Sequence, residues 1–257
     1  MSAGELKEPT VASSQAFERL GEAAKRRELA WRRLAEAFYG PTDEWVVALL
    51  SGDVERDVRH AISWLDSDTE LFDDALAALA RFVSLHGSES PAAVREILEV
   101  DYAALFIGPA QNIPAQPYES VWMDVDAQSG LHIFGNASTA AVEAVYGSYG
   151  LTRAASHHDL SDHVATEQEF LCYLCEREAA AWSCGDLDQA KQLRASEQEF
   201  LTGHLARFAP DLCRATQTAL PESLYAALAG YLLAFLTVDS GISYTKIVSS
   251  MWPAGKP

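Results

Sequence analysis

Two short segments carry the side chains whose types and spacing are best suited to chemistry. The first, residues 101–122, breaks a helix at Gly108-Pro109, so the last carbonyls of that helix lack partners and the next residues cross the surface. The second, residues 161–167, places Asp162 and His163 side by side at the start of a helix, where the partial positive charge of the helix favours an acid. Together the segments predict a site for a basic peptide.

A groove for a peptide with two arginines and an apolar stretch needs carboxylates that accept guanidinium groups and aromatic faces for stacking. The two segments contain both kinds of side chain: the acids Glu119, Asp124 and Asp162, and the aromatic residues Tyr102, Tyr118 and Trp122. Core packing is the preferred interpretation for Tyr102 and for its neighbours Leu105 and Phe106. Tyr118 and Trp122 fit either core packing or peptide contact, and Asp162 fits either a guanidinium partner or a helix cap.

A metal-dependent helical enzyme is the alternative hypothesis for the second segment. Its candidate ligands are His157, His158, Asp162, His163 and Glu167, of which His163 and Glu167 lie one helical turn apart. The Glu-x-x-His motif of di-iron bundles and the His-Glu-x-x-His motif of zinc proteases are both missing from the sequence. The peptide-binding hypothesis is therefore preferred.

Other catalytic motifs are also missing, and the sequence predicts a protein that is not an enzyme and has no cofactor. Cys172 and Cys175 have Cys-x-x-Cys spacing, but they lie in the middle of a predicted helix, whereas redox pairs begin one. The glycine-rich motifs of nucleotide-binding proteins and the Gly-x-Ser-x-Gly motif of hydrolases do not occur.

The charge balance constrains the class of partner. The 257 residues include 19 Lys and Arg against 37 Asp and Glu, a net charge of −18. Such a field repels nucleic acid and attracts a cationic partner, although it also serves solubility alone. We expect no nucleic-acid partner.

Localisation in the cytoplasm is expected from three features. The four cysteines are too few for a disulfide scaffold, and the first residues lack the basic and apolar regions of an export signal. The longest apolar run, residues 224–238, is shorter than a membrane span and is predicted to be a buried core helix.

Helical periodicity dominates the chain, which predicts an all-α fold, a single-domain bundle of about ten helices. The expected domain covers residues 13–252, between flexible tails at 1–12 and 253–257. The main predicted helices cover residues 13–39, 69–86, 90–108, 137–149, 162–183, 186–208 and 221–238, with shorter ones starting at Thr42, Asp53 and Pro210 and a further segment at 243–251. Only residues 131–135 have a faint strand pattern.

The two segments resemble the TorD/DmsD/NarJ family of redox-enzyme maturation chaperones. The resemblance rests on Asp101-Tyr102-x-x-Leu105-Phe106-Ile107-Gly108-Pro109, on Pro117-Tyr118-Glu119-Ser120-Val121-Trp122, and on Asp162-His163 followed by Glu167-x-Glu169-Phe170-Leu171. It covers roughly residues 90–215. Ser161 stands where the family usually has proline, Asp101 replaces a common glutamate, and Phe208 replaces a typical tryptophan; these departures bear on which client is bound.

The resemblance implies an all-helical cytoplasmic chaperone for a molybdenum-cofactor oxidoreductase of the dimethyl-sulfoxide-reductase type. Its partners are the catalytic subunit and its twin-arginine signal peptide, and it holds the enzyme back from export until the cofactor is inserted. A monomer and a homodimer both remain open, as does a role as an assembly subunit unrelated to export. The candidate peptide-binding residues are Tyr118, Glu119, Ser120, Trp122, Asp124, Asp162, His163 and Glu167.

Overall fold

The fold is all-α, as the periodicity predicts. The computed structural model describes residues 11–65, 68–108, 113–124, 134–153 and 159–240. Within these ranges there are eleven α-helices, one short 3₁₀-helix (η1) and no strand, apart from an isolated β-bridge. The helices are α1 (Val11–Phe38), α2 (Asp43–Leu50), α3 (Asp53–Ile62), η1 (Thr69–Phe72), α4 (Asp73–His86), α5 (Pro91–Phe106), α6 (Glu119–Met123), α7 (Ala137–Ser148), α8 (Val164–Cys184), α9 (Leu187–Gly203), α10 (Leu205–Ala219) and α11 (Leu224–Ser240).

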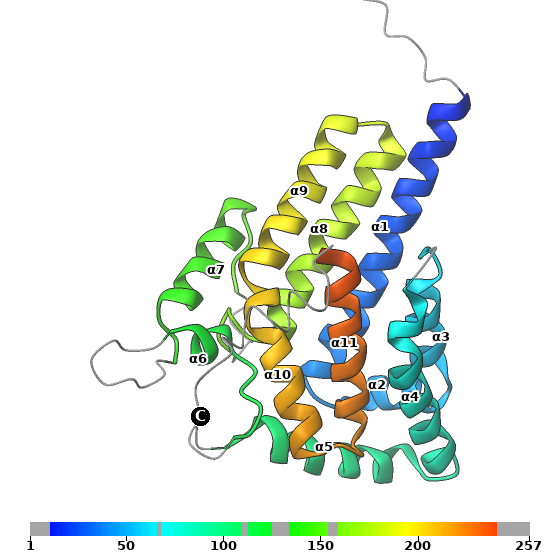
Figure 1. The fold of residues 1–257 in the computed structure, drawn as a ribbon, viewed down its shortest axis with the longest axis vertical. Coiled ribbons are helices and arrows are strands. Elements are labelled where there is room, and N and C mark those ends of the chain that lie inside the picture. Colours follow the sequence, from blue (N-terminus) through cyan, green and yellow to red (C-terminus); the bar gives the residue numbers. More distant parts are fainter. Residues whose placement is uncertain (1–10, 66–67, 109–112, 125–133, 154–158, 241–257) are drawn as a thin grey trace, which may run out of the picture.

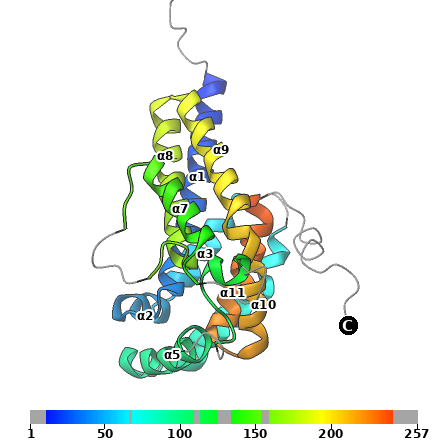
Figure 2. The same cartoon turned by 90° about the vertical axis from the view of Figure 1, so that its left-hand side faces the viewer.

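The helices form one bundle around α11. The long helices α1, α8 and α9 run side by side, with α8 packed against both of the others (Figures 1 and 2). Helix α11 packs between α10 and α4, and α3 packs on α1. Helices α2 and α5 close one end of the bundle, while α6 and α7 lie on the side away from α3 and α4 (Figure 1).

Helix α11 is central because it is apolar around its whole circumference. Thirteen of its 17 residues are buried. Trp31 of α1 packs its ring edge-on against Phe235, with ring centroids 4.8 Å apart, and Tyr231 packs on Phe72 of η1. A helix that is hydrophobic all round requires neighbours on every side. The apolar run at residues 224–238 is therefore a core helix, as predicted, and no helix in the described ranges has the length and apolar character to cross a membrane.

Local capping signals fix several helix ends. Thr42 accepts a hydrogen bond from the Trp45 N–H at the start of α2 (3.1 Å), and Ser90 caps α5 ahead of Pro91. Asp186 caps α9 by accepting from the Gln189 N–H at 3.0 Å. Each cap satisfies an N–H that the helix leaves unpaired. The predicted starts of these helices are confirmed.

Several helix boundaries differ from the prediction, among them the start of the apolar helix, which is Leu224 and not Pro221. The helix expected over residues 186–208 stops at Gly203, because His204 departs from helical geometry (φ −128°, ψ −88°). Helix α10 then starts at Leu205, so Pro210 lies inside it, where it removes a single backbone N–H. The helix expected from residue 162 begins instead at Val164.

The predicted tails are described only in part. Helix α1 starts at Val11, two residues inside the expected N-terminal tail of 1–12. Residues 1–10 and 241–257 lie outside the described ranges, as do the segment predicted at 243–251 and most of the faint strand pattern at 131–135.

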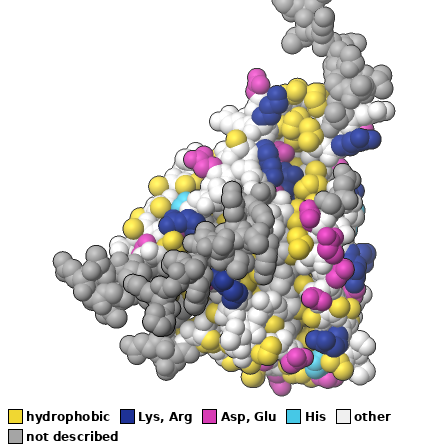
Figure 3. Space-filling model, in the orientation of Figure 1, with side chains coloured by type: hydrophobic (Ala, Val, Ile, Leu, Met, Phe, Trp, Pro, Cys, Tyr) yellow, Lys and Arg dark blue, Asp and Glu magenta, His cyan; other side chains and the backbone are white. Residues whose placement is uncertain are grey.

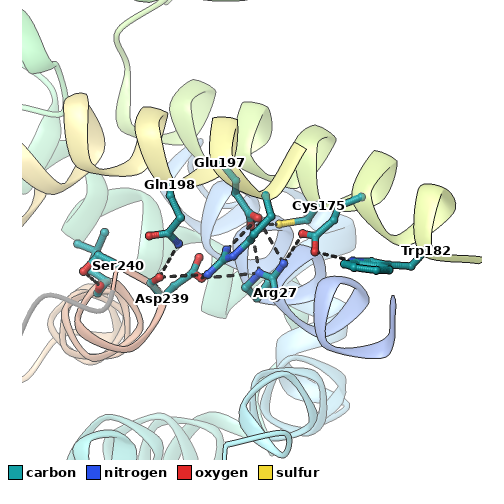
Figure 4. Close-up of polar contacts among 10 residues, drawn as sticks. Arg27, Cys175, Trp182, Glu197, Gln198, Asp239 and Ser240 are labelled. Carbon is teal, nitrogen blue, oxygen red and sulfur yellow. Dashed lines mark hydrogen bonds and ion pairs between the residues drawn. The ribbon is translucent and has the colours of Figure 1, made fainter. Parts of the chain in front are cut away.

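A buried ionic cluster joins four helices and was not predicted. We call it the Arg27 cluster; it consists of Arg27 of α1, Glu178 of α8, Arg194 and Glu197 of α9, and Asp239 of α11 (Figure 4). The Arg27 Nε atom lies 3.1 Å from Glu197 Oε1 and 3.7 Å from Asp239 Oδ1, and the guanidinium also pairs with Glu178. Arg194 contacts Glu197 and Asp239, both at 2.8 Å.

The two arginines of the Arg27 cluster neutralise most of its acid charge. Burial works against ionisation of Glu197, but Arg27 and Arg194 outweigh it and hold the pKa of Glu197 below its usual value. Asp239 is also fully buried, and burial together with nearby Glu197 raises its pKa. Such clusters are strongly destabilised when one partner is removed.

The surface shows mixed charges. On the face drawn in Figure 3, acidic and basic side chains are interspersed among apolar ones. Several are paired along a helix, such as Arg59 with Glu55 on α3 and Arg95 with Glu99 on α5. Exposed pairs of this kind contribute little to stability.

Candidate functional site

The two segments singled out in the sequence lie side by side. Tyr118 and His163 form an isolated antiparallel β-bridge. The Glu119 N–H donates to the Asp162 carbonyl at 2.9 Å, and the Val164 N–H donates to the Pro117 carbonyl at 2.7 Å. The bridge therefore ties the loop that precedes α6 to the start of α8.

Asp162 holds the first turn of α6 and is not the cap of α8. Its side chain is fully buried, and its Oδ2 accepts a hydrogen bond from the Ser120 N–H at 2.8 Å. The cap of α8 is His163, whose Nδ1 accepts from the Ala165 N–H at 3.2 Å. The interpretation of Asp162 as the cap of the helix that follows it is therefore wrong, because His163 takes that position.

His163 lies between two aromatic rings. Tyr39 of α1 stacks on its imidazole with centroids 5.8 Å apart and an interplanar angle of 4°, and Tyr118 meets it edge-on at 5.0 Å. Only 1% of the His163 surface is exposed. The Tyr118 hydroxyl, in turn, donates to Asp159 Oδ1 at 2.9 Å. The imidazole is held in one orientation by these contacts.

Two more predicted residues, Glu119 and Asp124, hold α6 against its neighbours. Glu119 is fully buried, and its carboxylate lies 2.9 Å from His204 Nδ1 and 3.4 Å from an Arg207 nitrogen. Asp124 accepts from the N–H and the hydroxyl of Ser138, at 2.8 and 2.7 Å.

Ser120 and Trp122 provide further contacts between α6 and its surroundings. The Ser120 hydroxyl accepts from the Gly135 N–H at 3.1 Å, and the Trp122 ring nitrogen donates to the Gln116 carbonyl at 2.7 Å. Three of the acids predicted to face a peptide, Glu119, Asp124 and Asp162, therefore already have partners within the fold.

Glu167 is an unpaired buried acid. It lies in the first turn of α8 with 0% exposure, and neither carboxylate oxygen has a hydrogen-bond partner among the described residues. Burial, together with the nearby acids Glu119 and Asp162, raises the pKa of Glu167 well above its usual value. A carboxyl group in this environment is favoured in its neutral form.

The accessible part of the site is a pocket next to the bridge. It has a volume of about 320 Å³, and aromatic residues of α7 and α8, Tyr146, Phe170 and Tyr173, line it. Glu169 also lines this pocket; it is exposed, and its Oε2 accepts from the Tyr39 hydroxyl at 2.7 Å. Arg153 contributes to the lining and donates to the Asp159 carbonyl at 2.7 Å.

Sequence reasoning missed Glu169 and Tyr39 as members of the site. Glu169 follows Glu167 by two residues on α8, and this spacing turns it away from the buried side of the helix. Glu169 could have been identified from the sequence, because it is an acid in the early turns of the helix that follows Asp162-His163. Tyr39 carried no local signal, because it reaches the site from the distant α1.

Core packing is confirmed for the residues assigned to it. Leu105 and Phe106 are buried, and the Tyr102 ring packs against Phe106 and Tyr225. The Tyr102 hydroxyl donates to the Phe38 carbonyl at 3.1 Å.

The described residues do not form a metal site or a thiol pair. His157 and His158 lie outside the described ranges, and within those ranges no three His, Cys, Asp or Glu side chains are grouped to hold a metal ion. Cys172 and Cys175 are free thiols with separate acid partners, Glu28 and Glu197. Burial raises the pKa of Cys172 to about 12, which disfavours the reactive thiolate.

Comparison with known proteins places the chain in a family. The family model described as nitrate reductase delta subunit matches residues 65–214, a range that contains both segments, the bridge and the pocket next to it. No curated protein matches the chain. Because the matched range is more than half of the 257 residues, the protein belongs to the nitrate reductase delta subunit family, the NarJ- and TorD-type chaperones of molybdoenzyme maturation.

Proposed function

We propose that this protein binds the twin-arginine signal peptide of a molybdenum-cofactor oxidoreductase catalytic subunit in the cytoplasm. By holding that peptide it assists folding and cofactor insertion and delays export, without catalysis of its own. Membership of the maturation-chaperone family and the net charge of −18 both support a basic client segment.

The single observation that carries the proposal is the pocket beside the bridge. An exposed carboxylate, Glu169, and the rings of Tyr146, Phe170 and Tyr173 line the same volume of about 320 Å³. A guanidinium group is recognised by this combination, because it pairs with the carboxylate while its planar face stacks on a ring. The volume accommodates one or two side chains, so one arginine enters and the rest of the peptide lies outside.

The other candidate residues take supporting roles in this proposal. Asp162 and His163 hold the loop and α8 together, and Tyr118 and Trp122, which are partly exposed, contribute contact surface for the peptide. Glu119, Ser120 and Asp124 fix the position of α6 through contacts with neighbouring segments, and Glu167 is buried in the first turn of α8. Glu169 then supplies the charge that faces the ligand.

Calorimetry with the client's signal peptide tests the proposal. We expect the native peptide to bind, and replacement of its two arginines by lysine to weaken binding roughly tenfold, because an ammonium group cannot make the bidentate, stacked contact. The protein variant Glu169→Gln is expected to reduce this discrimination between arginine and lysine. Equal affinities for the native, lysine and alanine peptides would refute recognition of the arginine pair.

The positioning role of Asp162 gives a separate prediction. Asp162→Ala leaves the buried Ser120 N–H without an acceptor, so we expect a loss of about 1 to 3 kcal/mol in the free energy of unfolding together with weaker peptide binding. Asp162→Asn retains an oxygen acceptor and is expected to preserve both properties. If Asp162 instead paired directly with an arginine, Asp162→Asn would lose affinity and keep its stability, a result that urea unfolding and calorimetry on the same samples distinguish.

A further inference from the structure

A second groove lies between two helix pairs and is separate from the pocket at Glu169. Its volume is about 540 Å³, and residues of η1 and α4 form one wall while residues of α10 and α11 form the other. It has no lining residue in common with the pocket beside the bridge. Helices α4 and α11 pack side by side along it (Figure 1).

The floor of this groove is apolar and made of small side chains. Ala75 of α4 and Ala226, Ala227 and Ala234 of α11 contribute to it, and all four are nearly buried. At Gly230 the helices approach closely, because an added Cβ would lie 3.3 Å from Gln217 Nε2 and 3.5 Å from Ala75 Cβ. The apolar surface is thus reachable from outside but is not filled by the protein's own large side chains.

The rim of the groove adds an exposed apolar residue and unpaired acids. Leu71 is 40% exposed at the edge of the groove. Glu70 and Asp74 line the groove and are exposed, and neither forms an ion pair with any described residue. Acids on other helices do have arginine partners, as Glu55 and Glu99 show. Residues 66–74 contain five acids and no basic residue, so no cation is supplied locally.

We infer that the groove is a docking site for a basic amphipathic helix of a partner protein. Large apolar side chains on one face of that helix fill the space above the alanines, and Lys or Arg residues beside them pair with Glu70 and Asp74. The charge complementarity selects this occupant, since a rim of unpaired acids disfavours a neutral or acidic segment. A second copy of this chain has a net charge of −18, so the acidic rim would repel it.

A synthetic amphipathic helical peptide of leucine and lysine is the probe, with a counterpart in which every lysine is glutamate. We expect the lysine peptide to bind and the glutamate peptide not to bind. The double variant Glu70→Lys with Asp74→Lys is expected to weaken binding of the lysine peptide about tenfold, as two lost ion pairs at a partly covered rim would. The matched control is the double variant Asp73→Lys with Glu96→Lys, which changes the net charge by the same amount at two exposed residues that do not line the groove.

A second pair of variants tests the apolar floor. Ala78 lines the groove, so Ala78→Leu is expected to block the lysine peptide, whereas Ala77→Leu at the adjacent, exposed position is expected to leave binding unchanged. Equal effects of the groove and control variants would overturn the proposal, because the peptide would then be responding to net charge alone. A dimer in sedimentation that Ala78→Leu abolishes would also overturn it, because the groove would then bind a second copy.

Binding of the client's signal peptide to the same variants separates the two proposals. We expect it to be unchanged by the groove variants, since the pocket at Glu169 does not contain the substituted residues. Loss of signal-peptide binding in these variants would assign the groove to the signal peptide and refute a separate partner. Absence of signal-peptide binding in the wild type would refute the proposed function. The experiment with the lysine peptide would still test the groove, because it does not depend on the signal peptide.

Discussion

Arg27→Ala is expected to lower the free energy of unfolding by about 3 to 5 kcal/mol, the usual cost of removing one partner from a buried ionic cluster. Arg27 is 4% exposed and is the only residue of α1 in the Arg27 cluster. Without it, Glu178 loses its cation and the pair Glu197 and Asp239 retains only Arg194. The remaining acids stay buried, and water cannot replace the guanidinium.

Urea unfolding followed by circular dichroism measures this effect. The control is Arg26→Ala, the preceding residue of α1, which pairs with the half-exposed Glu22 at 3.3 Å. We expect the control to cost less than about 1 kcal/mol, as exposed ion pairs do. A cost of similar size for both variants would show that Arg27 contributes packing and helix propensity rather than charge neutralisation.

Glu167→Gln is expected to make the protein more stable at neutral pH and to change how stability depends on pH. The folded state raises the pKa of Glu167 well above the usual 4.5, through burial and the neighbouring acids Glu119 and Asp162. The folded state therefore holds a proton that the unfolded state releases above pH 4.5, and the wild type loses stability as the pH rises from there toward the folded pKa. The glutamine side chain does not titrate, so it avoids this loss.

The difference in the free energy of unfolding between the wild type and Glu167→Gln isolates the contribution of the Glu167 carboxyl group. We expect the advantage of Glu167→Gln to be absent below pH 4.5 and to grow with pH by up to about 1.4 kcal/mol per pH unit until the folded pKa is passed. Urea unfolding at a series of pH values measures it, with Glu169→Gln as the control at an exposed position of the same helix. Parallel stability curves for wild type and Glu167→Gln would contradict a neutral buried carboxyl.

The helices were predictable because their signals are local. Thr42, Ser90-Pro91 and Asp186 mark helix starts through caps that involve residues three positions away. The apolar run of α11 marks the core in the same way. The break at His204 had no such signal, since its side chain is held by Glu119, which precedes it by 85 residues.

The sequence predicted where the candidate site lies, but it did not predict most of the contacts within the site. The sequence predicted that the loop before α6 and the start of α8 belong together. The bridge between Tyr118 and His163 confirms that the two segments lie side by side. The partner of Asp162 is the backbone N–H of Ser120, and a backbone group 42 residues away leaves no pattern in side-chain types. Glu197 of the Arg27 cluster was missed for a related reason, because charged residues in an amphipathic helix are usually solvated.

The Arg27 cluster has a consequence for how the chain is made. Arg27 belongs to α1, but its partners Glu178 and Glu197 follow 151 and 170 residues later. At the usual speed of translation, about 5 to 20 residues per second, α1 waits roughly 10 to 30 seconds for them. During that time the face of α1 that packs on α8 has no permanent cover, and Arg27 lacks these two partners. This maturation chaperone therefore passes through an interval in which that face of α1 is open to wrong contacts, and the interval ends only when α8 and α9 leave the ribosome.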